Sequence, residues 1–412
     1  MRKQIAFCLS FLPAVIFAQT NNPFFELQPD SSFKWTAGTY ANYAVGSTAM
    51  TNEFINSFWT GKFIDENQKQ RVQSRLKNSN TIGGDANAGL FYIQGIDSLF
   101  QHKKLAWFVA IKERAHANAR FSRDLFNVAF EGNDSYKGKT ADFSGFELNE
   151  IQYQQFQGGV MSDRFGIGIS VYNGQQMSLL KAKTASLYTS QYGDYLDFNT
   201  SYSMILSDPR HTGLGSSNGI GSGLDLYARM PMTLHNGHKA DLIVELSDLG
   251  FIRWNAGTNH YKNDTTYHFD GFVVKNAFQL ADTSMHYSAK AALNAKPDQK
   301  GAYATYVPAT LDVKFAPLGV RFQYLLGIRY RFDSDYRAYG YGQIHYHFGP
   351  RFILAAEIGY GGYANLQTGL TLTAKLNSGL AMQLGANNVM AYIAPSMSGG
   401  QGVFLSLSKT FR

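Results

Sequence analysis

The chain has 412 residues, of which 16% are charged and 15% are aromatic, and 40 are glycine. The charged share is well below the ~25% of ordinary soluble domains, and this composition suits a wall that faces lipid on one side and water on the other. The formal charge of +7 comes from scattered Lys and Arg without a nucleic-acid-binding motif, so we expect no nucleic-acid partner. Cys8 is the only cysteine, which excludes an internal disulfide.

The first residues have the layout of a secretory signal peptide. A short basic start precedes an apolar run from Ile5 to Phe17, and polar sequence begins at Gln19. We expect cleavage after Ala18, which makes residues 1–18 the signal peptide. Later segments fall short of the ~20 apolar residues of a membrane-spanning helix. An exported chain of this kind that spans a membrane must therefore do so as a closed β-barrel.

Residues 19–83 form a polar and aromatic lead-in. Within it, Trp35 to Val45 is a candidate strand. The run from Asp65 to Lys77 predicts a helix, because Asp65 suits an N-cap and the apolar residues fall near one face. This helix is too polar to cross lipid. We expect a short helix-containing segment at or in the lumen of the barrel, where it would act as a plug; a surface helix is the alternative.

From residue 84 onward, apolar residues recur with the period of two that marks a half-buried strand. A soluble sandwich would bury an aliphatic face, whereas aromatic-rich faces on strand after strand favour a wall in contact with lipid. The last residues, Val403 to Arg412, keep this alternation up to the terminus. The clearest apolar faces are Leu105, Trp107, Val109 and Ile111; Phe165, Ile167, Ile169 and Val171; and Phe322, Tyr324, Leu326, Ile328, Tyr330 and Phe332.

Short turns and longer polar stretches separate these runs. Turn dipeptides such as Ser162-Asp163 and Gly349-Pro350 contrast with polar stretches near residues 121–147, 207–219, 279–307 and 390–400. About fifteen candidate strands follow residue 84, and bacterial barrels favour even numbers. The sequence therefore predicts an all-β fold, a transmembrane antiparallel β-barrel of about 14 strands (range about 12–16) over residues 84–412.

Several short motifs, in this order, resemble a family of outer-membrane barrels. They are the signal-peptide end Phe17-Ala18-Gln19-Thr20, the stretch from Asn56 to Asp65, Arg123-Asp124-Leu125, Phe130-Glu131-Gly132-Asn133, the stretch from Leu249 to Asn255, and Phe269-Asp270-Gly271. The chain resembles Bacteroidota outer-membrane barrels of the fatty-acid-transporter-like (FadL-like) superfamily, and within it an uncharacterised family known only by a domain of unknown function.

The resemblance covers nearly the whole mature chain. It implies a fourteen-stranded barrel whose N-terminal residues fold into or under the lumen, and it supplies no catalytic residues. Related barrels include accessory parts of type IX secretion and gliding machinery, as well as transporters of hydrophobic molecules.

Polar and charged residues on the later strands are predicted to face the lumen. An Arg or Lys in contact with lipid at the midplane costs ~2–4 kcal/mol, so these side chains are expected inside, where they would stiffen the barrel or line a solute path. His345 and His347 share one face and could bind a metal together with Glu357, but a polar lumen wall is the preferred interpretation and we predict no metal. The predicted lumen-facing residues are Arg329, Arg331, Gln343, His345, His347, Glu357 and Lys375.

The segment from Gly250 to Trp254 is the most distinctive aromatic cluster. Phe251 and Trp254 are predicted to anchor at the membrane interface, with Arg253 near a lipid headgroup; a docking patch for a partner is the alternative. The chain has no G-x-S-x-G elbow, H-E-x-x-H motif or Walker loop. We therefore predict no catalytic residues, no enzymatic activity and no cofactor.

Two functions fit these predictions, and both place the protein in the outer membrane of a Gram-negative envelope after signal-peptide cleavage. The first, slightly preferred, is a non-enzymatic accessory component of an envelope secretion, motility or assembly complex, with protein partners. The alternative is a FadL-like, porin-like channel or carrier for transport of hydrophobic or small solutes, with a hydrophobic ligand. Outer-membrane lipid is a partner in both.

Overall fold

The computed structural model describes residues 22, 25, 34–96, 105–211, 213–235, 237–270, 297–317, 322–376 and 379–411. The predicted signal peptide, residues 1–18, lies outside them. The described helices are α2 (Asn52–Thr60), α3 (Glu66–Gln73), α4 (Arg123–Glu131) and α6 (Met390–Ile393), with one 3₁₀ turn at Asp134–Tyr136. Among the residues just named, no helix is long and apolar enough to cross a membrane.

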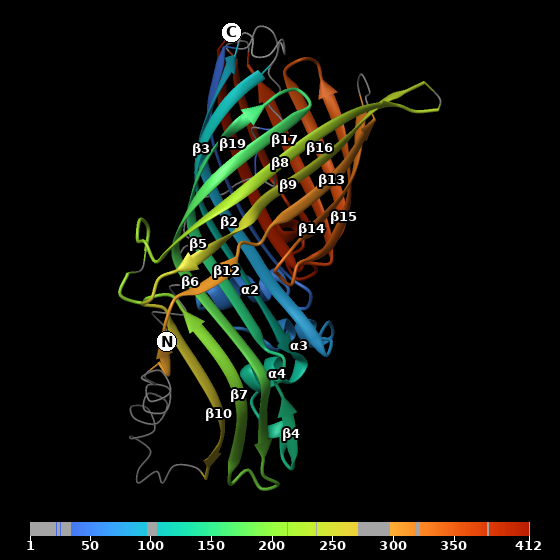
Figure 1. Ribbon diagram of the computed structural model, residues 1–412. Helices are drawn as coiled ribbons and strands as arrows, with labels where there is room; N and C mark the ends of the chain where they lie inside the picture. The colour runs from blue at the N-terminus through green and yellow to red at the C-terminus, as the bar shows by residue number, and fades with distance from the viewer. Residues whose placement is uncertain are drawn as a thin grey trace.

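The described strands all belong to one antiparallel sheet (Figure 1). They are β1 (Trp35–Ser47), β2 (Ser79–Ile96), β3 (Leu105–Ser122), β4 (Lys139–Asp142), β5 (Glu147–Met161), β6 (Phe165–Thr189), β7 (Leu196–Leu206), β8 (Gly219–Thr233), β9 (Lys239–Trp254), β10 (Asn259–Phe269), β11 (Gln299–Lys300), β12 (Tyr303–Tyr306), β13 (Thr310–Pro317), β14 (Phe322–Arg331), β15 (Arg337–Phe348), β16 (Phe352–Gly362), β17 (Leu366–Lys375), β18 (Leu380–Ala386) and β19 (Gly400–Phe411).

Fourteen of these strands close into a barrel, which confirms the predicted fold class. The first and last strands join in register, with Trp35 opposite Phe411 and Gly46 opposite Gly400. The other edge of β1 pairs with β2 from Trp35 to Ser47. The barrel therefore begins at β1 and not at residue 84, because the candidate strand near Trp35 is the one that closes it. Its strands are β1, β2, β3, β5, β6, β8, β9 and β13 to β19.

The period of two in the sequence separates an outer from an inner face. On β14, Phe322, Leu326 and Ile328 are each more than half exposed. The alternate residue Arg331 is nearly buried and contacts Asp85 on β2, which is not a neighbour of β14. Apolar side chains thus form an outer belt suited to the hydrocarbon of a bilayer, while charged side chains meet inside.

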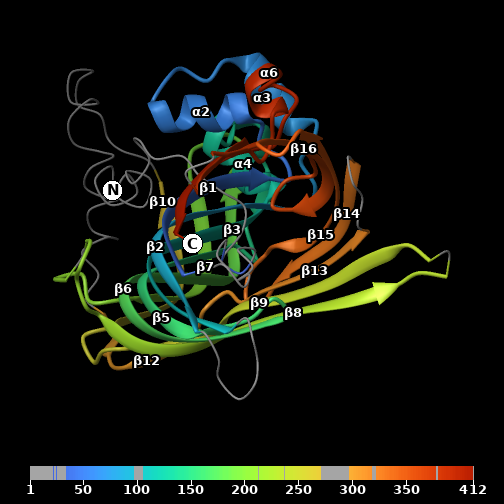
Figure 2. The ribbon, with the colours of Figure 1, turned by 90° about the horizontal axis from the view of Figure 1, so that it is seen from above.

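The two ends of the barrel differ. The turns after β5, β15 and β17 lie at the end that holds Trp35 and Phe411, called here the turn end. Aromatic side chains mark it on the outer face: Trp35 stacks on Phe411 (ring centroids 3.8 Å apart) and on Tyr92, which in turn contacts Trp107. The opposite end, called the helix end, carries α2, α3 and α4 (Figure 1) and also α6 (Figure 2).

The helices pack on the outside of the wall and not in the lumen. The helix predicted from Asp65 is confirmed as α3, whose Asp65 and Gln68 form a reciprocal capping box. Phe54 of α2 and Val72 of α3 pack with Ile82 and Phe121, which point outward on β2 and β3. This placement corrects the expectation of a lumenal helix, because the apolar faces of α2 and α3 bury against outward side chains. Figure 2 shows α2, α3 and α6 beyond the ring of strands.

A second departure from the predicted barrel is a sheet that continues past the wall at the helix end. β6 has 25 residues: it pairs with β8 through Gly174 and with β7 from Ser178 onward. β10 extends this sheet by pairing with β7 from Asn259 to Phe269. We call β4, β7, β10 and the second half of β6 the sheet extension, which hangs below the barrel in Figure 1.

Candidate lumen site

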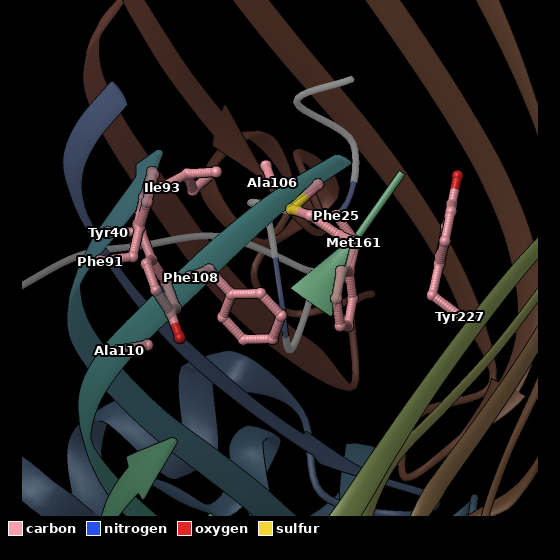
Figure 3. Packing of buried hydrophobic residues seen from close by; sticks show 9 residues of the cluster. All are labelled: Phe25, Tyr40, Phe91, Ile93, Ala106, Phe108, Ala110, Met161 and Tyr227. Carbon is pink, nitrogen blue, oxygen red and sulfur yellow. The ribbon is translucent and has the colours of Figure 1, made fainter. Parts of the chain in front are cut away.

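The lumen near the turn end holds a cluster of buried apolar side chains, called here the aromatic chamber. They come from β1, β2, β3, β5 and β8, and one comes from the segment that precedes β1. The chamber residues are Phe25, Tyr40, Phe91, Ile93, Ala106, Phe108, Ala110, Met161 and Tyr227 (Figure 3).

Phe25 fills this chamber although it does not belong to the wall. Its ring stacks on Tyr227 at 5.4 Å with an interplanar angle of 19°, and it meets the edge of Phe108 at 5.5 Å and 85°. Only 1% of Phe25 is exposed. Both geometries are favourable for aromatic pairs. A side chain from outside the wall therefore bridges β3 and β8, two wall strands that are separated by β5 and β6.

Three residues earlier, Asn22 makes the polar counterpart of this contact. Its side-chain amide donates to Ser247 (3.1 Å), Glu245 (3.4 Å) and Asp225 (3.5 Å), and its carbonyl oxygen accepts from Lys112. The side chains of Lys112 and Asp225 are fully buried, with Nζ and Oδ2 3.9 Å apart. Asn22 thus forms hydrogen bonds to polar and charged groups of β3, β8 and β9 inside the barrel.

A β-bulge places the next charge pair toward the helix end. Asp248 has a positive φ of 62°, and the register between β8 and β9 shifts between Leu224 and Leu226. The bulge turns Asp248 inward, where it accepts from Arg114 Nη2 at 2.7 Å. The same bulge reverses which residues of β9 face outward after it.

Arg331 lies at the centre of a cross-lumen network beyond this pair. Its Nη1 donates to Asp85 at 2.6 Å, and Asp85 also lies 2.8 Å from His116. Tyr363 contacts the other ring nitrogen of His116 at 3.1 Å. Nearby, Asn118 and Arg120 both donate to Asp335. Strands from opposite sides of the barrel are thereby joined by charge-assisted hydrogen bonds.

A cavity lies beside this network. Its volume is about 100 Å³, and Asn87, Arg114, Arg331 and Tyr336 are among its lining residues. A space of this size lined by polar groups suits a few water molecules better than an apolar molecule.

The other predicted lumen residues form smaller groups. Arg329 donates to Asp312 at 2.7 Å and lies over the Tyr341 ring. Glu357 accepts from Tyr339 at 2.7 Å and from Gln343 at 2.5 Å.

The remaining three predicted lumen residues lie on β15 and β17. His345 Nε2 lies 2.9 Å from Gln343 Oε1, whereas His347 is half-buried on β15 and Lys375 is exposed at the end of β17. The structure does not bring His345, His347 and Glu357 together as a metal site: within the described ranges, no group of three or more His, Cys, Asp or Glu side chains could hold a metal ion.

The predicted interface cluster divides between the two faces of β9. Phe251 (45% exposed) and Arg253 point outward, but Trp254 is fully buried. Its indole packs with Ile252 and Val307 and donates to Thr305 at 2.9 Å. Trp254 is therefore an interior residue and not an interfacial one, because a period of two cannot place Phe251 and Trp254 on the same face.

Sequence reasoning missed the residues that fill the lumen. Asn22 and Phe25 precede the first strand and carry no periodic signal. Lys112 was open to prediction, since it alternates with the outward residues Val109 and Ile111 and so faces inward. Its partner Asp225 lies on β8, which does not pair with β3, so the contact could not be inferred from local alternation.

Comparisons with known proteins place the chain in a family. A family model described as a family of unknown function, DUF5723, matches residues 27–394. No curated protein matches the chain.

Among solved structures, the chain is similar to a deltaS2S3 mutant of the TodX monoaromatic hydrocarbon channel (10% identity, covering 97% of this chain and 96% of that chain, TM-score 0.41). It is also similar to a FadL homologue of Pseudomonas aeruginosa (11% identity, covering 97% of this chain and 100% of that chain, TM-score 0.40). A third similar structure is the toluene transporter TbuX of Ralstonia pickettii (6% identity, covering 97% of this chain and 96% of that chain, TM-score 0.29). The barrel assignment does not depend on these low scores, since it follows from the strand pairings. The family model spans most of the sequence, and the chain therefore belongs to the DUF5723 family of unknown function.

Proposed function

We propose that the protein is an outer-membrane carrier for small apolar solutes, and that Phe25 occupies the solute site in the resting state. Phe25 carries the proposal. An aromatic side chain that is not part of the wall lies in an aromatic chamber inside a closed barrel. Any apolar molecule of similar size can replace it, since the chamber offers ring contacts and few polar groups.

The solute class follows from how the chamber holds Phe25. Tyr227 stacks on the ring and Phe108 meets its edge, so a flat single ring is favoured over a bulky fused system. Met161 and Ile93 add aliphatic surface that adapts to short substituents. We therefore expect single-ring or short-chain apolar molecules to bind.

The charged layer on the helix side of the chamber supports a carrier over an open pore. The Arg331–Asp85 and Arg114–Asp248 pairs occupy the lumen between the chamber and the helix end. Free ions would have to pass these pairs, so low ion conductance is expected with or without Phe25 in place.

Replacing Phe25 with Ala tests the proposal by emptying the chamber. The purified protein in lipid nanodiscs is photolabelled with 3-(trifluoromethyl)-3-phenyldiazirine, a single-ring apolar probe, and labelled residues are located by mass spectrometry. We expect the wild-type protein to be labelled mainly on its outer belt. The Phe25→Ala variant should gain several-fold labelling at Phe108, Met161 and Tyr227, and excess toluene should suppress that gain.

Phe198→Ala is the matched control, since Phe198 is a 37% exposed phenylalanine of the sheet extension. It should leave the labelling pattern unchanged. In intact cells, uptake of a fluorescent apolar probe should rise with Phe25→Ala, while planar-bilayer conductance stays near the wild-type level. If Phe25→Ala labels only the belt, the chamber does not accept apolar solutes and the proposal fails.

A second candidate function is an accessory component of an envelope secretion, motility or assembly complex. The sheet extension favours it, because this sheet continues beyond the lipid-facing wall and ends in a turn where Tyr192 is 89% exposed. A depression of about 730 Å³ also lies on this sheet and is lined by Glu147, Lys181 and Lys262, among others. A photo-crosslinking residue at position 192 or 198 in native cells should capture the same protein; a chain that stays uncrosslinked at both positions argues against this role.

A further inference from the structure

The helices outside the wall carry a group of exposed apolar side chains that the lumen site does not use. Phe63 follows the C-terminal cap of α2 and is 88% exposed. Ile393 (73%) and Met397 (69%) lie at α6, beside the 56% exposed Tyr392. Together with Trp59 of α2, these residues form what we call the collar patch. Four of them are more than half exposed, and a group of exposed apolar side chains marks a surface that interacts with a membrane or a partner.

The two parts of the collar patch belong to one rigid unit. The start of α2 is joined to the segment after α6 by backbone hydrogen bonds from Asn52 to Ser398 (2.8 Å) and from Glu53 to Pro395 (3.2 Å). Arg75, just after α3, donates to the carbonyl of Met397 at 2.8 Å. The α2 and α6 regions therefore hold the patch in place together.

The patch continues the lipid-facing surface of the barrel. Tyr43 points outward on β1, and its ring lies 6.3 Å from that of Trp59. The aromatic residues of the turn end begin with Trp35 on the same strand. Tyr43 is eight residues further along β1, which at ~3.3 Å per residue and a ~45° tilt places it ~19 Å away along the membrane normal.

This separation of ~19 Å approaches the height of a lipid-facing band. Barrels of this class carry an apolar band ~25 Å tall with an aromatic girdle at each edge. The residues around Trp35 form one girdle, and Tyr43 with Trp59 stands where the second is required. Lys62 lies beside Phe63 in sequence and supplies a cation suited to headgroup phosphates.

From this continuity we infer that the collar patch is a membrane-binding surface, seated in the headgroup region of the leaflet at the helix end. The occupant is lipid: the patch is level with the edge of the band and projects outward from the wall. Phe63, Ile393 and Met397 enter the boundary between headgroups and acyl chains. The stretch from Asn56 to Asp65, a motif noted in the sequence, is thereby assigned a physical role that is independent of transport.

Site-directed spin labelling of the full chain tests this inference. Cys8 is the only cysteine, so a Cys8→Ser background permits single labels at Phe63→Cys, Leu90→Cys and Tyr192→Cys. Leu90 (62% exposed) reports the belt, and Tyr192 (89% exposed) is the matched aromatic position on the sheet extension. Collision rates with oxygen, which concentrates in lipid, and with a water-soluble nickel chelate are measured in phosphatidylcholine and phosphatidylglycerol nanodiscs.

The label at Phe63 should collide more with oxygen than with the nickel chelate, as at Leu90, while the label at Tyr192 shows the reverse. A second label at Ile393→Cys should agree with Phe63. A Phe63 label that behaves like the one at Tyr192 overturns the inference, since the patch would then lie in water. A label shielded from both reagents overturns it too, because protein and not lipid would cover the patch.

Discussion

Replacing Arg331 with Met is expected to lower the free energy of unfolding by about 3 kcal/mol, the lower end of the range for breaking a buried ion pair from one side. The Arg331 side chain is only 10% exposed, and its Nη1 lies 2.6 Å from Asp85 Oδ2. The variant keeps most of the side-chain volume but removes the guanidinium beside Asp85, whose side chain is 26% exposed and keeps His116 at 2.8 Å as a hydrogen-bond partner. Urea unfolding in lipid vesicles, followed by circular dichroism, measures the change.

Arg71→Met is the matched control for that experiment. Arg71 pairs with Glu53 at a similar distance, 2.7 Å, but the two side chains are 38% and 31% exposed outside the wall. An exposed pair contributes about 0–1 kcal/mol. Adding Asp85→Asn to Arg331→Met should recover part of the loss, because the uncompensated carboxylate is removed. Equal effects of Arg331→Met and Arg71→Met would mean that the lumen network is solvated and not buried.

The second large effect is expected from Lys112→Met, with a loss of about 3–5 kcal/mol. Lys112 and Asp225 are both fully buried, and Glu245 adds a second carboxylate next to Asn22. Removing the only cation that contacts Asn22 among the described residues leaves these acids facing each other. The N-terminal segment should also detach more readily, since Asn22 loses the hydrogen bond from Lys112.

Both consequences can be measured on one variant. Urea unfolding reports the stability, and limited proteolysis of the folded protein reports how firmly the segment around Phe25 is held. Lys181→Met serves as the control, because Lys181 is 67% exposed on the sheet extension. The double variant Lys112→Met/Asp225→Asn should regain stability. Unchanged proteolysis in Lys112→Met would show that Asn22 does not hold the segment in the lumen.

The sequence predicted the strands of the barrel wall better than the side-chain contacts inside the lumen. A strict period of two identified strands such as β3 and β14, and it placed Phe322 and Ile328 outside because an apolar face next to lipid must be continuous. It could not predict that Arg331 would meet Asp85, since a contact between residues 246 positions apart depends on how the barrel closes.

The period of two also fails where the backbone adds a residue. The bulge at Asp248 reverses the faces of β9, and for this reason Trp254 lies inside while Phe251 lies outside. A single Asp whose backbone adopts the left-handed region has no sequence pattern from which the bulge could be predicted. The sheet extension was missed for a related reason: the alternation in β6 continues past the membrane without marking where lipid ends.

The placement of the predicted helix shows the same limit. Asp65 and the spacing of Val72 and Leu76 were sufficient to predict α3. The packing partners Ile82 and Phe121 determine on which side of the wall the helix lies. They can be recognised only when it is known which alternate residues of β2 and β3 point outward. The lumen is instead filled by Asn22 and Phe25, two residues without any local pattern.

The most direct test of the account is to locate Phe25. A benzophenone amino acid at position 25 of the full chain, irradiated in lipid nanodiscs, should crosslink within the same molecule to peptides from Leu105–Ser122 and Gly219–Thr233, the strands that hold Phe108 and Tyr227. The same amino acid at Tyr192 should not reach either peptide. Crosslinks from position 25 only to lipid, or to no part of the barrel, would contradict an occupied aromatic chamber and the carrier proposed from it.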